Sequence, residues 1–203
     1  MTVTQDAERH RAKMATRKEA QARKLAGKTV EGKGLLMVHT GTGKGKSSAA
    51  FGLLLRALGH GWRCAVVQFG KGQWESGERA ALRRFSDLCE LHALGQGFTW
   101  ETQDRARDVA AAEAAFAKAR ELMEAPDLKL LVLDELNIAL RYDHLPLERV
   151  LDALRGRRED LTVVVTGRNA KPELIEAADL VTEMTLVKHH FAAGVRAQPG
   201  IEF

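Results

Sequence analysis

Short apolar runs alternate with longer stretches of mixed polarity along most of the chain. The apolar runs predict buried strands at residues 35–38, 63–69, 88–94, 129–136, 161–166 and 180–187. The stretches between them predict helices at residues 47–58, 79–85, 104–124 and 146–155, with a short one starting at Pro172. Strands that alternate with helices favour a mostly parallel sheet with helices on both faces, which is an α/β fold.

The stretch GLLMVHTGTGKGKSS, from Gly34 to Ser48, joins an apolar strand, a glycine-rich turn and the start of a helix. Glycines allow backbone N–H groups to curl around phosphate groups, and a helix N-terminus adds partial positive charge. A lysine neutralises the outer phosphate oxygens, and a hydroxyl directly after it is placed to bind Mg²⁺. The pattern therefore predicts a nucleotide site at Gly41, Thr42, Gly43, Lys44, Gly45, Lys46, Ser47 and Ser48.

The glycine pattern departs in one place from the P-loop consensus GxxxxGK[ST]. Counting back five residues from Gly45 reaches Thr40, where the consensus has glycine, and the nearest glycine is Gly41. A glycine-rich turn without a ligand is the alternative interpretation of such a pattern. The apolar strand before the turn and the helix after it favour phosphate binding, and hence a P-loop, RecA-like α/β domain.

Two acids follow the most apolar run of the chain: residues 130–133 are Leu-Leu-Val-Leu, and Asp134 and Glu135 come next. Ligands of open α/β sheets collect at the C-terminal ends of the strands. A carboxylate here is therefore expected to complete the Mg²⁺ shell together with the Ser47 hydroxyl. Sequence does not decide which acid contacts the ion, and an acid that faces solvent is the alternative. Arg168 follows the next strand, where a phosphate contact and a surface role are both open.

Three of the few aromatic residues lie in predicted loops beyond strand ends: Trp74, Phe98 and Trp100. Such residues either pack a loop onto the fold or form the wall of a pocket for a flat ligand, and composition favours neither. His189 and His190 are adjacent, so on a strand they would face opposite sides. Surface or packing roles are therefore expected for these two histidines.

Positive charge is concentrated at the N-terminus, where residues 1–33 carry a net charge of +5 while the rest of the chain carries −1. Residues 5–26 are rich in helix-forming residues but lack a strong apolar stripe, so a solvated, partly helical arm is expected. The alternative, a nucleic-acid-binding arm, is disfavoured because the arm contains no aromatic residue. We predict an arm at residues 1–33 and one domain at residues 34–203.

Composition is typical of a globular protein: of 203 residues, 45% are hydrophobic and 29% are charged. No run approaches the roughly 20 apolar residues of a membrane span, and no signal peptide is recognisable at the N-terminus. A cytoplasmic protein without a membrane contact is therefore expected. Cys64 and Cys89 lie in predicted strands, which favours buried, reduced thiols over a disulfide or a zinc site.

These motifs together resemble the P-loop-type ATP:corrinoid adenosyltransferases. The segment from Thr40 to Ser47, with threonine in place of the first glycine, is similar to that family's P-loop. More specific matches are VVQFGKG at 66–72, GFTWET at 97–102, LDEL at 133–136, YDHLPLE at 142–148, VTGR at 165–168 and VKHHFAAGVRAQPGIEF at 187–203. The matches run in order from about residue 34 to the end. The departures are mild, since Ser47 in place of threonine keeps the hydroxyl.

The resemblance implies a reaction in which a corrinoid reduced to Co(I) attacks the 5′ carbon of ATP and releases triphosphate, in adenosylcobalamin biosynthesis or salvage. It implies ATP as co-substrate, Mg²⁺ or Mn²⁺, and a corrinoid substrate, either cobalamin or a precursor. It also implies that ATP binds in the reverse sense along the loop, and that Phe98 and Trp100 lie at the corrinoid face. The catalytic residues expected on this basis are Lys46, Phe98, Trp100 and Glu135, with Arg168 among the nucleotide contacts.

The resemblance further implies a homodimer, an electron-donating flavoprotein reductase as partner, and an N-terminal arm that can fold over the bound corrinoid. Two other functions fit parts of the sequence. A phosphohydrolase or ATP-driven motor would use Glu135 to activate water. A nucleotide-gated nucleic-acid-binding protein would use the basic arm, with strongly salt-dependent affinity. The number of specific motifs favours adenosyl transfer over both.

Overall fold

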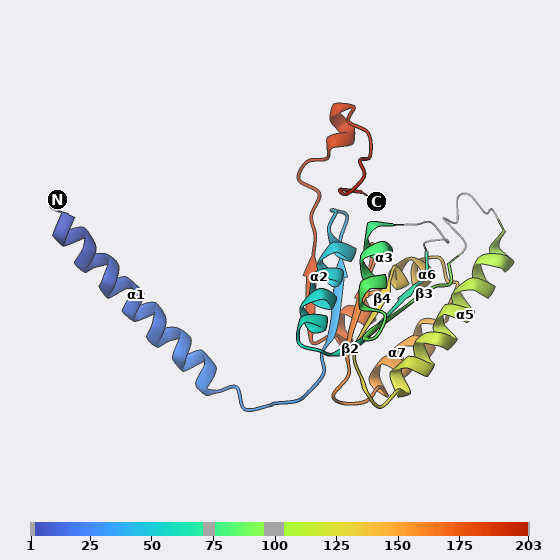
Figure 1. The fold of residues 1–203 in the computed structure, drawn as a ribbon, viewed down its shortest axis with the longest axis horizontal. Coiled ribbons are helices and arrows are strands. Elements are labelled where there is room, and N and C mark those ends of the chain that lie inside the picture. The colour runs from blue at the N-terminus through green and yellow to red at the C-terminus, as the bar shows by residue number, and fades with distance from the viewer. Residues whose placement is uncertain (1–2, 71–75, 96–103, 203) are drawn as a thin grey trace. The chain divides into compact units, whose positions relative to one another are not determined.

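The computed structural model describes residues 3–70, 76–95 and 104–202. In this described part the chain forms two compact units, Met1–Gly32 and Lys33–Phe203. The first unit contains helix α1 (Val3–Ala26), the long blue helix in Figure 1. From Asp6 onward the side chains of α1 are exposed or half-buried along the whole helix. This exposure agrees with a sequence that offers no apolar stripe for packing.

The second unit is built on a parallel sheet, for which the described residues supply six strands (Figure 1). The strands are β1 (Leu36–Thr40), β2 (Arg63–Gln68), β3 (Cys89–Ala93), β4 (Leu128–Asp134), β5 (Thr162–Thr166) and β6 (Leu180–Glu183). Their order in the sheet is β3-β2-β4-β5-β1-β6. Because neighbouring strands are parallel, their C-terminal ends meet at one edge of the sheet, and the predicted α/β fold is confirmed.

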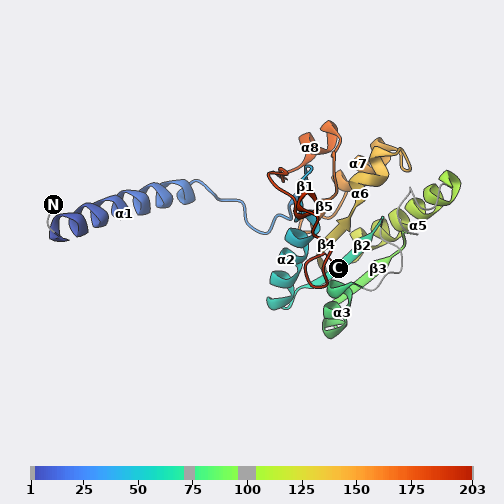
Figure 2. The same cartoon turned by 90° about the horizontal axis from the view of Figure 1, so that it is seen from above.

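Helices cover both faces of the sheet (Figure 2). On one face lie α2 (Lys46–Gly59) and α3 (Gly77–Leu82), and the 3₁₀ turn η1 (Arg83–Phe85) continues α3. On the other face lie α5 (Arg105–Glu124), α6 (Leu136–Arg141), α7 (Leu147–Arg155) and α8 (Pro172–Ala177). In β4, Val132 packs toward α2 whereas Leu131 and Leu133 pack toward the opposite helices. Both faces of the strands are therefore buried, which explains their continuous apolar runs.

The predicted boundaries hold for the long elements. Helix α5 begins after Asp104, whose carboxylate accepts a hydrogen bond from the Arg107 N–H at 3.1 Å, as expected of an N-cap. In the described part of the chain, no helix is both long and apolar enough to cross a membrane.

Two predictions about the sheet edge were wrong or incomplete. The last strand ends at Glu183 and not at residue 187, because Met184 leaves the sheet to contact the loop after β1. Helix α6 was not predicted, since it follows β4 without a polar turn. A single residue, Glu135 in the left-handed conformation with φ 63°, makes the connection.

Both cysteines are buried free thiols, as predicted. Cys64 and Cys89 occupy matching positions on the neighbouring strands β2 and β3. Burial raises the pKa of the Cys64 thiol to about 12 and that of the Cys89 thiol to about 11. Both thiols therefore stay protonated at neutral pH, which gives them low reactivity.

Candidate nucleotide-binding and active site

The predicted site residues gather where the strands end. The glycine-rich loop follows β1, the two acids stand at the end of β4, and Arg168 lies just beyond β5. The chain after β6 passes the same loop. The site is therefore assembled from segments that are far apart in sequence and that the parallel sheet brings to one edge.

The glycines of the loop permit a close approach by the backbone that follows β6. A Cβ atom at Gly41 would lie 2.5 Å from the Met184 carbonyl oxygen, and one at Gly43 would lie 2.8 Å from it. Two backbone hydrogen bonds fix this contact: Gly43 N donates to Met184 O at 2.6 Å, and Met184 N donates to Thr40 O at 2.9 Å. Gly45 has φ 105° and directly precedes α2, so the helix N-terminus points into the loop.

Thr40, the departure from the P-loop consensus, has a structural partner. Its Oγ1 accepts a hydrogen bond from the Ala170 N–H at 3.0 Å. Ala170 belongs to the turn that follows β5 and carries Arg168. A glycine at position 40 could not make this hydrogen bond. The threonine therefore connects the glycine-rich loop, called the phosphate loop below, to the turn that follows β5.

Lys46 is the buried cation of the loop, with 7% of its surface exposed. Its Nζ donates to the Gly43 carbonyl oxygen. Burial lowers the pKa of Lys46, the negative charge of Glu135 opposes this shift, and the positive charges of Arg168 and Lys44 add to it. Lys46 is thus near three of the other predicted site residues. Nearby in the loop, Ser47 is half-buried, while Thr42 and Ser48 are exposed.

The two acids have different surroundings. Asp134 is fully buried, and each of its carboxylate oxygens accepts a hydrogen bond. Thr166 Oγ1 donates to Oδ1 at 2.8 Å, and Gln68 Nε2 donates to Oδ2 at 3.0 Å. Arg79 in turn donates to Gln68 Oε1 through Nε at 3.2 Å and Nη2 at 3.1 Å. A chain of hydrogen bonds therefore joins α3, β2, β4 and β5 around this carboxylate.

Glu135, in contrast, is half-buried and oriented by its backbone. Its N–H donates to Thr166 Oγ1 at 2.9 Å, which holds the left-handed turn in place. Its carboxylate lies over the turn at Gly167, where an added Cβ would be 3.1 Å from Glu135 Oε2. The negative charge of Glu135 also raises the pKa of Lys46, against the effect of burial.

The Thr166 hydroxyl serves both acids at once, so replacing Thr166 with valine removes two hydrogen bonds without changing the shape of the side chain. We expect this variant to lower the free energy of unfolding by about 1–3 kcal/mol, because buried polar groups lose their partners. Urea unfolding followed by circular dichroism measures the change. Thr182→Val, at an exposed position on β6, is the control. A Thr166→Val loss no larger than that of the control would contradict the role given to this hydroxyl.

Asn137 supports the turn that carries Arg168. It is 1% exposed, and its Nδ2 donates to the Gly167 carbonyl oxygen at 2.9 Å. Gly167 has φ 125°, and an added Cβ would lie 2.8 Å from the Asn137 Cβ. Arg168 itself is exposed beyond this turn, where it is free to extend toward a ligand or toward solvent.

Five further residues were singled out in the sequence: Trp74, Phe98, Trp100, His189 and His190. Trp74, Phe98 and Trp100 lie outside the described residues. His189 and His190 are not on a strand, so the alternation of side chains along a strand does not apply to them. Both lie at the start of the 3₁₀ turn η2 (His190–Ala193), where their rings stack with centroids 4.7 Å apart. A strand pattern does not apply there because β6 has already ended.

Sequence analysis did not identify several residues that shape the site: Gln68, Arg79, Asn137, Thr166, Met184 and Glu202. Gln68 and Thr166 end strands and so lie at the functional edge, which was a usable signal. The others act through contacts between distant segments, which a sequence pattern does not show.

Known proteins resemble this chain over most of its length. The sequence model of the ATP:corrinoid adenosyltransferase BtuR/CobO/CobP family matches residues 32–203. A corrinoid adenosyltransferase of Pseudomonas aeruginosa is 55% identical over 196 residues, which are 97% of this chain and 96% of that protein. One from Sinorhizobium sp is 54% identical and covers 98% of this chain and 93% of its own length.

More distant proteins also match. The corrinoid adenosyltransferase CobA of Salmonella typhimurium is 46% identical over 85% of this chain and 87% of its own. Among solved structures, the KaiC-like protein PH0186 of Pyrococcus horikoshii has a TM-score of 0.44 at 18% identity, covering 81% of this chain and 77% of that one. From the family match and the identities above, the chain belongs to the ATP:corrinoid adenosyltransferase family.

Proposed function

We propose that this protein transfers the 5′-deoxyadenosyl group of ATP to the Co(I) centre of a corrinoid and releases triphosphate. The observation that carries the proposal is the gathering of Lys46, Glu135 and Arg168 at one sheet edge around a glycine-rich loop. Family membership gives this phosphate site its reaction. The reaction belongs to the biosynthesis or salvage of adenosylcobalamin.

The reaction does not need a nucleophile from the protein. The cobalt of the substrate donates an electron pair to the 5′ carbon of ATP, the bond from that carbon to the phosphate oxygen breaks, and its electron pair leaves with triphosphate. Negative charge therefore grows on the triphosphate. Lys46 and the N–H groups at the start of α2 would stabilise that charge. No serine, cysteine or histidine of the chain is required to form a covalent intermediate.

The donor set fits Mg²⁺ bound together with a phosphate chain. Among the described residues, no three His, Cys, Asp or Glu side chains group to hold a metal by themselves. Mg²⁺ commonly takes one or two protein oxygens and completes its shell with phosphate oxygens and water. We propose the Ser47 hydroxyl and the Glu135 carboxylate as these ligands, with Asp134 as a buried positioning residue. The ion would neutralise charge on the triphosphate.

The remaining parts of the proposal come from the family resemblance. Phe98 and Trp100 would lie at the corrinoid face, a homodimer would form in the cytoplasm, and a flavoprotein reductase would supply the electron that yields Co(I). Light scattering coupled to size-exclusion chromatography tests the dimer, and a monomer at micromolar concentration would contradict it.

The reaction itself is tested by mixing the purified protein with Mg²⁺, ATP and chemically reduced cob(I)alamin without oxygen. We expect the corrinoid visible spectrum to change to that of light-sensitive adenosylcobalamin, with one triphosphate released for each adenosyl group transferred. Omitting the corrinoid is the control. Release of orthophosphate in that control, with no spectral change in the full mixture, would identify an ATP-hydrolysing enzyme instead.

A further inference from the structure

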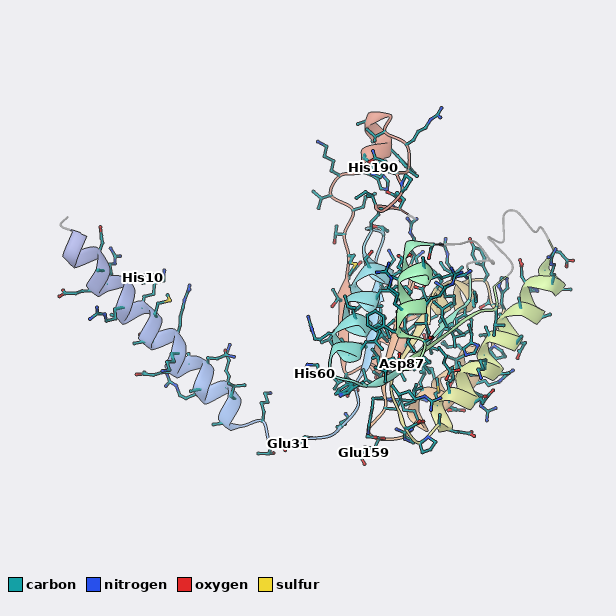
Figure 3. The ribbon with its side chains drawn as sticks, in the orientation of Figure 1. His10, Glu31, His60, Asp87, Glu159 and His190 are labelled. Carbon is teal, nitrogen blue, oxygen red and sulfur yellow. The ribbon has the colours of Figure 1, made fainter. Side chains whose placement is uncertain are left out.

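The chain after β6 leaves the body of the second unit, turns at η2 and comes back toward the phosphate loop (Figure 1). His190 marks the excursion in Figure 3, well away from the helices that cover the sheet. The returning end brings Glu202 to Lys44, which is one of the loop residues. We call residues 184–202 the C-terminal strap.

Glu202 has a basic side chain next to each of its two carboxylate oxygens. One carboxylate oxygen, Oε2, accepts a hydrogen bond from Lys44 Nζ, and the other, Oε1, lies 3.3 Å from His190 Nε2. The Glu202 side chain is only 10% exposed. The hydrogen bond from Lys44 lowers the pKa of Glu202, and the charges of Lys44, His190 and His189 add to the effect. Glu202 is therefore ionised at neutral pH.

Three donors of the phosphate loop are engaged by the chain itself. Gly43 N donates to the Met184 carbonyl oxygen, Lys46 Nζ donates to the Gly43 carbonyl oxygen, and Lys44 Nζ donates to Glu202. Two of these three partners, Met184 and Glu202, belong to the strap. A phosphate chain that takes up donors of this loop must therefore compete with strap oxygens.

The contacts of Glu202 leave one carboxylate oxygen without a hydrogen bond, although His190 lies near it. Its Oε1 is buried, yet no group in the described part of the chain donates a hydrogen bond to it. A buried oxygen without a donor destabilises the contact that buries it. The rest of the strap adds little packing, because Val187 and Ile201 are 92% and 74% exposed.

We propose that the Glu202 carboxylate competes with triphosphate for Lys44, so that the strap occupies the phosphate site when it is empty and yields when ATP binds. This inference rests on the proposed function, because it assumes that the loop binds a polyphosphate. Triphosphate is also the product that must leave after adenosyl transfer. The return of Glu202 to Lys44 would then assist product release.

Removing the charge of Glu202 should strengthen polyphosphate binding. The apparent dissociation constant of a ligand rises when the competent form of its site is only partly populated. Ion pairs between partly exposed side chains are worth little, so Glu202→Gln should bind tripolyphosphate about two- to fivefold more tightly. Glu176→Gln, which removes the same charge from an exposed position on α8, should leave the affinity unchanged.

Calorimetric titration of the full chain with tripolyphosphate in the presence of Mg²⁺ measures these affinities. In a Lys44→Met background the gain from Glu202→Gln should disappear, because the contested cation is gone. Equal affinity of wild type and Glu202→Gln would overturn the proposal while leaving the phosphate site intact. Absence of binding to either protein would overturn the phosphate site itself, and the proposal with it.

A second measurement follows the strap directly. Arg196 is an exposed trypsin site within it. We expect tripolyphosphate and Mg²⁺ to speed cleavage after Arg196 in the wild type, because the strap is released from Lys44. In Glu202→Gln, cleavage should be fast without the ligand. Slower cleavage of the wild type on ligand addition would mean that the strap closes over bound phosphate, which would overturn the competition.

Discussion

Replacing Lys46 with methionine is expected to give the largest loss of activity of any single change in this protein. Lys46 is the buried cation of the phosphate loop, and charge develops on the triphosphate as the bond to the 5′ carbon breaks. Loss of one preorganised donor to such a charge typically lowers kcat by about 10²- to 10³-fold. The anaerobic assay with cob(I)alamin and ATP measures this directly.

This loss should not come from a failure to fold. Lys46 is buried with a backbone carbonyl as its hydrogen-bond acceptor, and burial disfavours the charged form of its side chain. Methionine has a similar length without the charge, so the unfolding temperature of Lys46→Met should equal or exceed that of the wild type. Lys118→Met, at a half-buried position on α5, controls for loss of a lysine charge elsewhere in the protein. Activity of Lys46→Met within tenfold of the wild type would contradict a role in stabilising the leaving group.

Glu135→Gln and Asp134→Asn are expected to affect different properties. The first should change the Mg²⁺ requirement of the reaction, and the second the stability of the fold. If Glu135 is a metal ligand, Glu135→Gln should raise the Mg²⁺ concentration needed for half-maximal activity by about tenfold or more. Replacing residues that only hydrogen-bond to a metal ligand already has effects of this size. The Glu135 contact with Thr166 should persist in this variant, because it is made by the backbone N–H.

Asp134→Asn should instead destabilise the fold. An asparagine can still accept a hydrogen bond from Thr166 with its oxygen, but its amide nitrogen then faces the Gln68 amide nitrogen. Turning the Gln68 amide over only moves the conflict, because its nitrogen would then face the Arg79 guanidinium. Turning the asparagine amide over lets its oxygen accept from Gln68 but removes the acceptor of the Thr166 hydroxyl proton. In each arrangement a buried donor loses its acceptor, which should cost about 1–3 kcal/mol of unfolding free energy.

The measurement for both variants is activity as a function of Mg²⁺ concentration, together with urea unfolding. A Mg²⁺ requirement that rises in Asp134→Asn and not in Glu135→Gln would assign the metal to the other acid. Equal changes in both would mean that the two carboxylates share the ion.

Much of the fold could be predicted because it is written in local patterns. Continuous apolar runs indicated strands covered on both faces. The glycine-rich pattern from Gly41 to Ser47 indicated a loop between a strand and a helix. Asp134 and Glu135 could not be told apart, because their difference depends on Gln68, 66 residues before Asp134, and on Thr166, 32 residues after it. In the sequence, Thr40 is only a departure from the P-loop consensus. Its role depends on the fold, because the sheet brings the Ala170 N–H to its hydroxyl.

The end of the last strand shows a similar limit. The run from 180 to 187 has the composition of a strand, but composition carries no information about the close approach of Met184 to Gly41 and Gly43. The strap and its Glu202 contact follow from that approach. A pattern of residue types predicts which segments form elements, whereas the contacts that finish a site come from the order of the strands.

That order also bears on how the protein is made. β1 is the first strand to be synthesised, yet its two neighbours in the sheet, β5 and β6, are the last. At the usual pace of translation, roughly 6 to 25 seconds separate the synthesis of β1 from that of β5. During this interval β1, which is followed by a basic loop, has no native partner strand in the sheet. A nascent chain of this topology therefore exposes an unpaired strand for most of its synthesis, and the sheet edge that carries the candidate site is complete only when synthesis is nearly finished.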